Sequence, residues 1–169
     1  MRNGLWPNLF KEWNNKESET IHTLKLIPVF KHFTTKEFLE LEKLVHHRTY
    51  SQNEFIFKNN APGEGMYIIM KGSIKISVGS SKKDEKILAN LKEGDFFGEL
   101  ALFDDEPRSA NAISLSETKL IGFFTPDLLA LKDRNPVITN KILFNLGQIL
   151  GERLRKTNLL LIEEQKNDK

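Results

Sequence analysis

Two things are missing from this sequence: cysteine and any long hydrophobic run. Without cysteine the chain forms no disulfide, no thiolate metal site and no cysteine nucleophile, which is compatible with a reducing compartment. Its apolar runs are only a few residues long, far short of the roughly 20 that cross a bilayer, and its start lacks the continuous apolar segment of a secretory signal. We therefore expect a soluble, cytoplasmic protein.

A strong charge of one sign is missing as well. The 25 Lys and Arg residues and the 23 Asp and Glu residues are interspersed and leave a formal net charge of +2, so no strong field for nucleic acid is expected. The four histidines have none of the spacings of metal ligands, and no nucleophile-elbow pattern occurs. Nothing therefore argues for a metal site, a cofactor or an enzyme, and 169 residues are enough for one folding unit with a sizeable core.

What the sequence does contain is a segment, residues 96–112, with the features of an anion pocket. Phe96 and Phe97 close a strand-like stretch, Gly98 permits a tight turn, and residues 99–102 are good helix formers. The first N–H groups of a short helix there would lack internal partners and carry the positive end of its dipole. A phosphate could therefore sit on them.

Two charged residues refine this prediction. Arg108 adds a full positive charge that can grip two phosphate oxygens, and Pro107 stiffens the loop that delivers it. Glu99 is an unusual neighbour for an anion, because an ionised carboxylate only accepts hydrogen bonds. The pair therefore predicts a ligand that carries both a phosphate and a free sugar hydroxyl. We interpret the acidic link at residues 104–106 as a solvated loop.

The run Phe97-Gly98-Glu99-Leu100-Ala101-Leu102, followed by Pro107-Arg108-Ser109-Ala110, resembles the phosphate-binding cassette of the cyclic nucleotide-binding domain family. That family includes catabolite-activator-type regulators, protein kinase A regulatory subunits and cyclic nucleotide-gated channels. The resemblance covers roughly residues 30–160. It implies a 3′,5′-cyclic nucleotide as ligand.

The resemblance also implies a role for each cassette residue. Glu99 accepts a hydrogen bond from the ribose 2′-hydroxyl, Arg108 pairs with the cyclic phosphate, and Gly98 lets the ribose approach. Backbone N–H groups near Ala101, Ser109 and Ala110 complete the anion's shell, and the Ser109 hydroxyl donates as well. The predicted ligand-binding residues are Gly98, Glu99, Leu100, Ala101, Arg108, Ser109 and Ala110.

The base is less well defined by the sequence. Ile76, Val78 and Leu88 are candidates for the apolar wall around it. Ser109 stands where some guanine-selecting members of the family carry threonine, so the resemblance favours cAMP over cGMP.

From about His46 the apolar period changes toward two, with turn signals every eight to twelve positions, as in a sandwich or barrel. So many strands, interrupted once by a short helix, predict a mainly β fold with flanking helices: a double-stranded β-helix, or jelly-roll-type β-roll. The predicted strands cover residues 48–50, 54–57, 66–70, 74–78, 86–91, 110–115 and 119–124.

Helices are expected on both sides of the roll. Ser18 caps one over residues 18–27, Thr34 or Thr35 caps a second, and the Thr125-Pro126-Asp127 signature begins a third. A long helix then runs from Pro136 to about Ile162. The predicted organisation is an N-terminal helical extension at 1–29, a cyclic nucleotide-binding domain at 30–163 (roll about 46–124, C-terminal helices 126–163) and a polar tail at 164–169.

The two ends of the chain carry apolar side chains that need a partner. In residues 1–15, the spacing of the large side chains predicts that most of them lie on one side of a short helix that begins at Pro7. They could dock on a partner or on a membrane surface. We favour the alternative that they pack on the protein's own domain or on a second copy of it. Residues 159–162 are too apolar to project into water, so we expect the same helix of another protomer to cover them. Gly147 and Gly151 could permit a close approach of the helices, although this spacing is a weak signal outside membranes.

In catabolite-activator-type members the long helix leads into a winged helix-turn-helix, and in the channels it follows a membrane pore. The residues after Ile162 are too few for a recognition helix, and residues 1–29 cannot span a membrane. We therefore expect a stand-alone regulatory module that changes its helix arrangement, or its dimer or effector contacts, when a cyclic nucleotide binds. The alternative is a degenerate member of the fold that serves as a structural interaction module without ligand.

Overall fold

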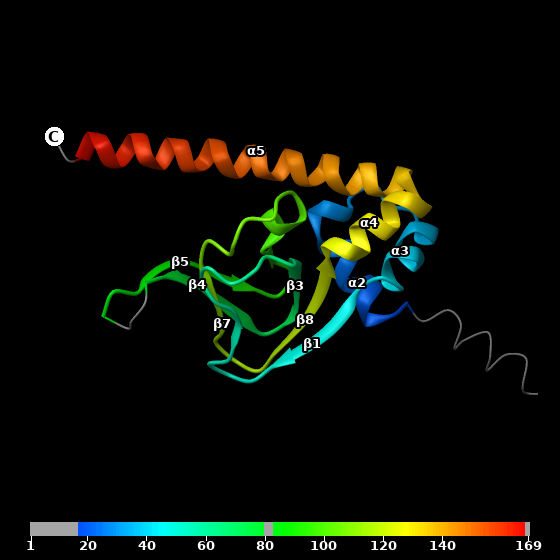
Figure 1. Ribbon diagram of the computed structural model, residues 1–169, viewed down its shortest axis with the longest axis horizontal. Coiled ribbons are helices and arrows are strands. Elements are labelled where there is room, and N and C mark those ends of the chain that lie inside the picture. Colours follow the sequence, from blue (N-terminus) through cyan, green and yellow to red (C-terminus); the bar gives the residue numbers. More distant parts are fainter. Residues whose placement is uncertain (1–16, 80–82, 168–169) are drawn as a thin grey trace, which may run out of the picture.

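The computed structural model describes residues 17–79 and 83–167. In Figure 1 the strands form a roll, helix α5 runs along one side of it, and helices α2, α3 and α4 gather at one end. The aromatic segment of residues 1–15, predicted to be helical, lies outside the described residues.

The described residues form two four-stranded sheets, with the strand orders β1-β8-β3-β6 and β2-β7-β4-β5, and every strand pair is antiparallel. The chain passes back and forth between the two sheets, so the predicted jelly-roll-type β-roll is confirmed. The strands are β1 (His46–Tyr50), β2 (Phe55–Phe57), β3 (Gly65–Lys71), β4 (Ser73–Val78), β5 (Lys86–Lys92), β6 (Phe96–Phe97), β7 (Asn111–Ser114) and β8 (Thr118–Phe124).

The seven strands predicted from the period of two are all present, with ends that differ by a few residues. The eighth is β6, which the sequence indicated only as a strand-like stretch. It pairs with β3 through Tyr67 opposite Phe97 and Ile68 opposite Phe96. This short pairing fixes the point where the chain leaves the first sheet and enters the cassette.

The two helices before the roll begin at the expected caps. Ser18 Oγ accepts from the Ile21 N–H at the start of α2 (Glu19–Leu26). Thr34 caps α3 (Thr35–Glu42) in a reciprocal arrangement with Glu37, whose carboxylate accepts from the Thr34 N–H. Between them lies a 3₁₀ turn, η1 (Pro28–Phe30), that was not predicted.

The two helices after the roll are α4 (Thr125–Arg134) and α5 (Pro136–Asn167). The cap of α4 comes from Asp127, whose carboxylate accepts from the Phe124 N–H at 3.0 Å. The Thr125 hydroxyl does not cap this helix but donates to the Ala101 carbonyl at 2.8 Å, which joins α4 to the cassette. Helix α5 continues to Asn167 and is longer than predicted.

The apolar side chains form two clusters. The larger one joins the helices to the first sheet and contains α2, η1, α3, α4 and the first half of α5 packed against β3 and β8. The smaller one lies inside the roll, where Tyr67 stacks on Phe97 with ring centroids 5.6 Å apart and Phe57 lies 5.8 Å from Phe97. These aromatic rings give the cassette a rigid base.

Candidate functional site

A cavity of about 500 Å³ opens between the second sheet, the cassette and α5. All seven residues predicted from the sequence line it. The lining consists of Phe57, Ile76, Ala89, Leu91, Phe96, Phe97, Gly98, Glu99, Leu100, Ala101, Asp104, Glu106, Pro107, Arg108, Ser109, Ala110 and Arg153.

Gly98 begins the cassette in a conformation that only glycine adopts easily. Its φ is +75°, in the left-handed region. A Cβ built at this position would lie 2.7 Å from Nη1 of Arg108, and the Gly98 carbonyl accepts from the same Nη1 at 3.0 Å. Gly98 is thus required both by the turn and by the close approach of the arginine.

The short helix predicted after Gly98 is a four-residue 3₁₀ turn, η2 (Glu99–Leu102), and not an α-helix. So short a turn aligns few peptide dipoles, and the Ala101 N–H already faces the Gly98 carbonyl at 3.4 Å. The predicted attraction of an anion by the helix terminus is therefore small. Most of the positive charge in the cassette must come from Arg108.

Arg108 is a buried cation, only 7% exposed. Its Nη1 and Nη2 donate to the carbonyls of Gly98 and Gly65, at 3.0 and 2.8 Å, and its guanidinium lies 4.2 Å from the centre of the Phe57 ring. Its Nε–H is buried without a hydrogen-bond partner, and no carboxylate of the described residues forms an ion pair with it.

The surroundings of Arg108 make this charge costly unless an anion joins it. Burial lowers the pKa of the guanidinium, while the neighbouring Tyr67, Glu64 and Glu99 act in the opposite direction. The backbone on either side is fixed, because the Arg108 N–H donates to Ala61 and its carbonyl accepts from Asn60, both at 2.8 Å. The fold therefore holds an incompletely satisfied cation at the wall of a cavity.

Glu99 is buried too, at 6% exposed, and its carboxylate accepts from Nη1 of Arg153. Arg153 comes from α5, and its guanidinium lies 4.7 Å from the centre of the Phe96 ring. Arg153 was not predicted as a site residue from the sequence. No local signal could have found it, because the contact joins positions 54 residues apart.

The apolar wall agrees only in part with the prediction. Ile76 lines the cavity, whereas Val78 and Leu88 do not, and Ala89 and Leu91 take their place. In the pairing of β4 with β5, Ile76 lies opposite Ala89 and Ile74 opposite Leu91, so Ala89 and Leu91 share the face of Ile76, whereas Leu88 is the extra residue of a bulge and is 53% exposed.

The acidic link agrees with the prediction of a solvated loop. Asp104 and Glu106 are exposed, as a solvated loop requires, yet both contribute to the rim of the cavity. Among the described residues, no group of three or more His, Cys, Asp or Glu side chains is arranged to hold a metal ion. No helix within the described ranges has both the length and the apolar character needed to cross a membrane.

Comparison with known proteins agrees with this geometry. The model of the cyclic nucleotide-binding domain matches residues 47–135, just over half of the chain. The cyclic AMP receptor protein of Thermus thermophilus is 34% identical over 124 residues, which cover 71% of this chain and 56% of that protein. A potassium channel protein of Rhodopseudomonas palustris is 30% identical over 82% of this chain and 34% of its own length.

Solved structures are similar as well. The catabolite activator protein of Thermus thermophilus superposes with a TM-score of 0.71 at 31% identity and covers 79% of this chain and 61% of its own. A cyclic nucleotide-binding domain from Methylobacillus flagellatus has a TM-score of 0.75 over 96% of this chain and 92% of its own; at 21% identity it shows the fold alone. The chain spans only about half the length of the first of the curated relatives and a third of the second. On the evidence of the matched residues and the cassette, this chain belongs to the cyclic nucleotide-binding domain family.

Proposed function

We propose that this chain binds a 3′,5′-cyclic nucleotide in the cavity beside Arg108, with cAMP preferred to cGMP, and acts as a regulatory module. The observation that carries the proposal is the buried, unpartnered Nε–H of Arg108. A cyclic phosphate brings one negative charge and two free oxygens, which suit the Nε–H and the remaining Nη hydrogens of one guanidinium. Binding such an anion removes the penalty of leaving a buried donor unpaired.

The other cassette residues are proposed to hold the sugar and complete the anion's shell. Glu99 accepts from the ribose 2′-hydroxyl, since only one of its oxygens is used by Arg153 within the described residues. Gly98 leaves room for the ribose, and Leu100, Ala101, Ser109 and Ala110 surround the phosphate. The preference for cAMP follows from Ser109 and from the 34% identity with a protein named as a cyclic AMP receptor.

The proposed output is a change in the helices that touch the cassette. Thr125, at the start of α4, bonds to Ala101, and Arg153 of α5 bonds to Glu99, so both helices meet η2 directly. A ligand shifts their arrangement only as far as it binds one arrangement more tightly than the other. The chain contributes binding rather than catalysis, and the cytoplasmic location stays a prediction.

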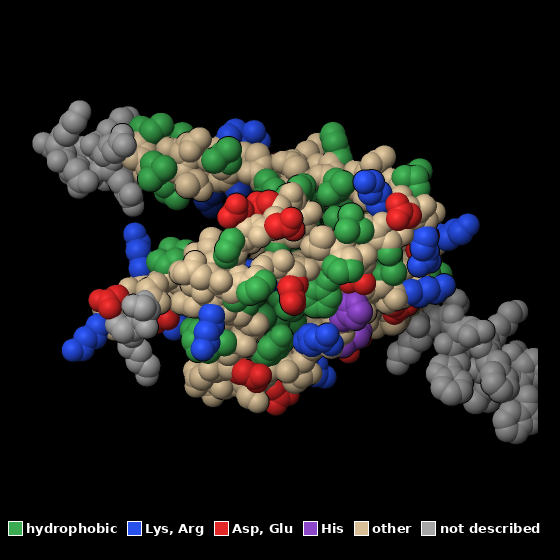
Figure 2. Space-filling model, viewed as in Figure 1, with side chains coloured by type: hydrophobic (Ala, Val, Ile, Leu, Met, Phe, Trp, Pro, Cys, Tyr) green, Lys and Arg blue, Asp and Glu red, His purple; other side chains and the backbone are tan. Residues whose placement is uncertain are grey.

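The proposed partner is a second copy of the chain, paired through α5. The last turns of this helix expose large apolar side chains, and Figure 2 shows hydrophobic groups along the part of α5 that stands clear of the roll. Three leucines of this part of the helix recur at steps of four and seven and therefore share one side, as a two-helix seam requires. They are Leu150, Leu154 and Leu161. An effector protein on the same seam is the alternative partner, and sedimentation of the chain alone distinguishes the two.

The test of ligand binding is calorimetric titration of the purified, nucleotide-stripped chain with cAMP and with cGMP. We expect micromolar or tighter binding of cAMP, about −8 kcal/mol or better, and a loss of roughly 100-fold in Arg108→Ala. Arg48→Ala removes an exposed arginine from β1 and is the matched control, which should bind like the natural chain. Absence of binding by a folded, stripped chain would favour the interaction module without ligand.

A further inference from the structure

We propose that Arg153 is a positioning residue for the ribose: through its ion pair it holds the Glu99 carboxylate in the orientation that accepts the 2′-hydroxyl. This inference rests on the proposed function and deepens it. It assigns a role in the binding site to a residue that lies outside the cassette and beyond the match to the family model, which ends at residue 135.

The first argument is that Glu99 needs a cation. Its side chain is 8% exposed, and Arg153 is the ion-pair partner that the described residues provide for it. A buried charge without a partner of opposite sign is poorly solvated, so an isolated carboxylate tends to turn toward water. With Arg153 on one oxygen, the Glu99 carboxylate is held toward the cavity and keeps the other oxygen for a hydroxyl donor.

The second argument is that Arg153 is itself held in place. Ile142, Leu146 and Ile149 recur at steps of three and four along the side of α5 that packs on the helical cluster, and Arg153 is the next residue in that series. Its guanidinium also lies over Phe96, whose backbone is fixed by pairing with β3. A cation between a packed helix and an aromatic ring is oriented before any ligand arrives.

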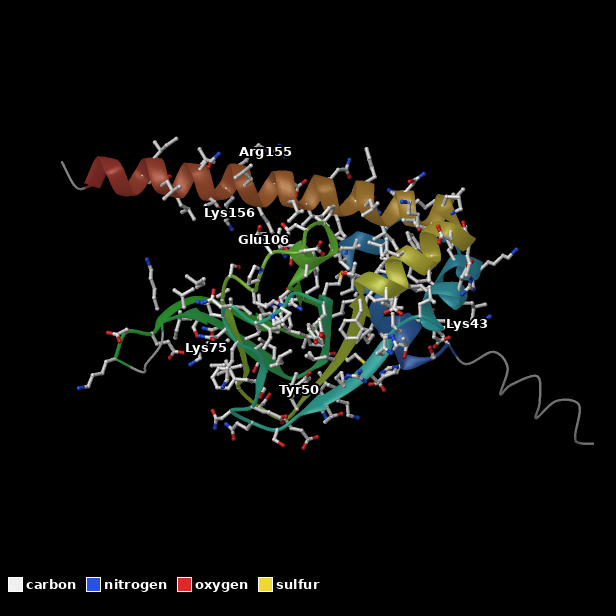
Figure 3. All side chains as sticks on the ribbon, viewed as in Figure 1. Lys43, Tyr50, Lys75, Glu106, Arg155 and Lys156 are labelled. Carbon is white, nitrogen blue, oxygen red and sulfur yellow. The ribbon has the colours of Figure 1, made fainter. Side chains whose placement is uncertain are left out.

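The third argument is that no nearby cation repeats this arrangement. Figure 3 shows Arg155 on the side of α5 turned away from the roll and Lys156 on the side facing it. Neither residue lines the cavity or forms an ion pair with a carboxylate of the described residues. Arg155→Ala therefore removes the same charge from the same helix without touching Glu99, and it is the matched control.

The experiment uses a ligand that lacks the group in question. The natural chain, Arg153→Ala, Arg153→Lys and Arg155→Ala are titrated with cAMP and with its 2′-deoxy analogue. We expect Arg153→Ala to weaken cAMP binding about tenfold and to change the affinity for 2′-deoxy-cAMP less than twofold, because that ligand never bonds to Glu99. Arg153→Lys should recover part of the loss, and Arg155→Ala should change neither affinity.

Titrating Glu99→Ala, and the double variant that carries both Glu99→Ala and Arg153→Ala, with the same two ligands completes a double-mutant cycle. If Arg153 acts through Glu99, the double variant binds cAMP no more weakly than Glu99→Ala alone. An equal loss for both ligands in Arg153→Ala overturns the proposal, because it means that Arg153 contacts the phosphate or the base, or only supports the fold. An unchanged affinity for cAMP overturns it too. A natural chain that binds neither ligand contradicts the proposed function itself, which separates the two failures.

Discussion

The two halves of α5, residues 136–151 and 152–167, contact the rest of the protein in different ways. In the first half, Ile138, Ile142 and Leu146 are at most 1% exposed and belong to the larger apolar cluster. In the second half, Leu154 is 62% exposed and the side chains of residues 159–162 are about half exposed. The second half reaches the rest of the molecule through Arg153, which meets Glu99 and Phe96 at the cavity.

This difference indicates which half of α5 a bound ligand would move under the proposed function. Burying one large aliphatic side chain contributes roughly 1.5–3 kcal/mol, and the first half of α5 buries several. An ion pair with one half-exposed partner contributes about 1 kcal/mol or less. On the proposed function, we therefore expect a ligand that changes the Glu99 contact to release or tighten the second half, whereas the first half should stay packed on the helical cluster.

The largest predicted effect tests this directly. Ile142→Ala removes a fully buried side chain from the first half and should lower the free energy of unfolding by about 2–5 kcal/mol. Leu154→Ala, in the second half, should lower it by less than about 0.5 kcal/mol in the monomer, because its side chain is exposed. Urea denaturation at low protein concentration measures both. Equal losses in the two variants would mean that the halves are anchored alike, contrary to the comparison.

The next largest effect is predicted for a substitution in the cassette, which contacts the second half of α5 through Glu99 and Arg153. Gly98→Ala puts a Cβ 2.7 Å from Nη1 of Arg108 and requires a left-handed conformation, so the free energy of unfolding should fall by about 1–2 kcal/mol and cAMP affinity at least tenfold. Limited proteolysis should find new cleavage in the second half of α5 and none in the first.

Gly94→Ala is the matched control for that experiment. Gly94 also has a positive φ, +84°, but nothing lies within 4 Å of a Cβ built there. It should show the loss of stability caused by strain alone and bind cAMP normally. If Gly94→Ala weakens binding as much as Gly98→Ala, the close contact with Arg108 is not the cause.

The same contrast explains what the sequence could and could not predict. The strands and the cassette could be predicted, because the β-favouring apolar run at residues 66–70 and the order of Gly98, Glu99 and Arg108 are local patterns. Arg153 could not, because its contact depends on where a long helix crosses the roll, 54 positions from Glu99. The choice of Leu88 for the base wall was wrong, because the face of β5 that meets the cavity depends on its pairing with β4: Ala89 lies opposite Ile76 and lines the cavity, whereas Leu88 does not.

The smallest predicted effect concerns a polar contact in the first half of α5. Lys141 Nζ lies 2.7 Å from a Glu37 carboxylate oxygen and so ties α5 to α3. Burial acts to raise the pKa of Glu37, but hydrogen bonds from Lys141 and Thr34 and the charge of Lys141 outweigh it, so the pKa lies below its usual value of 4.5. A carboxyl group whose pKa is lowered by folding stabilises the protein above its unfolded pKa and loses this contribution as the pH falls through the folded value.

Glu37→Gln should therefore cost about 1 kcal/mol or less near pH 7, and its difference from the natural chain should shrink as the pH falls below about 4.5. Thermal unfolding of both proteins across that range measures the difference, and Glu40→Gln, another change on α3, controls for the general effect of acid. Because apolar burial holds the first half of α5, cAMP affinity should stay within twofold of the natural value in Glu37→Gln. If this variant instead loosens the whole of α5 and weakens cAMP binding as strongly as Arg153→Ala, polar contacts anchor both halves and the distinction between them is wrong.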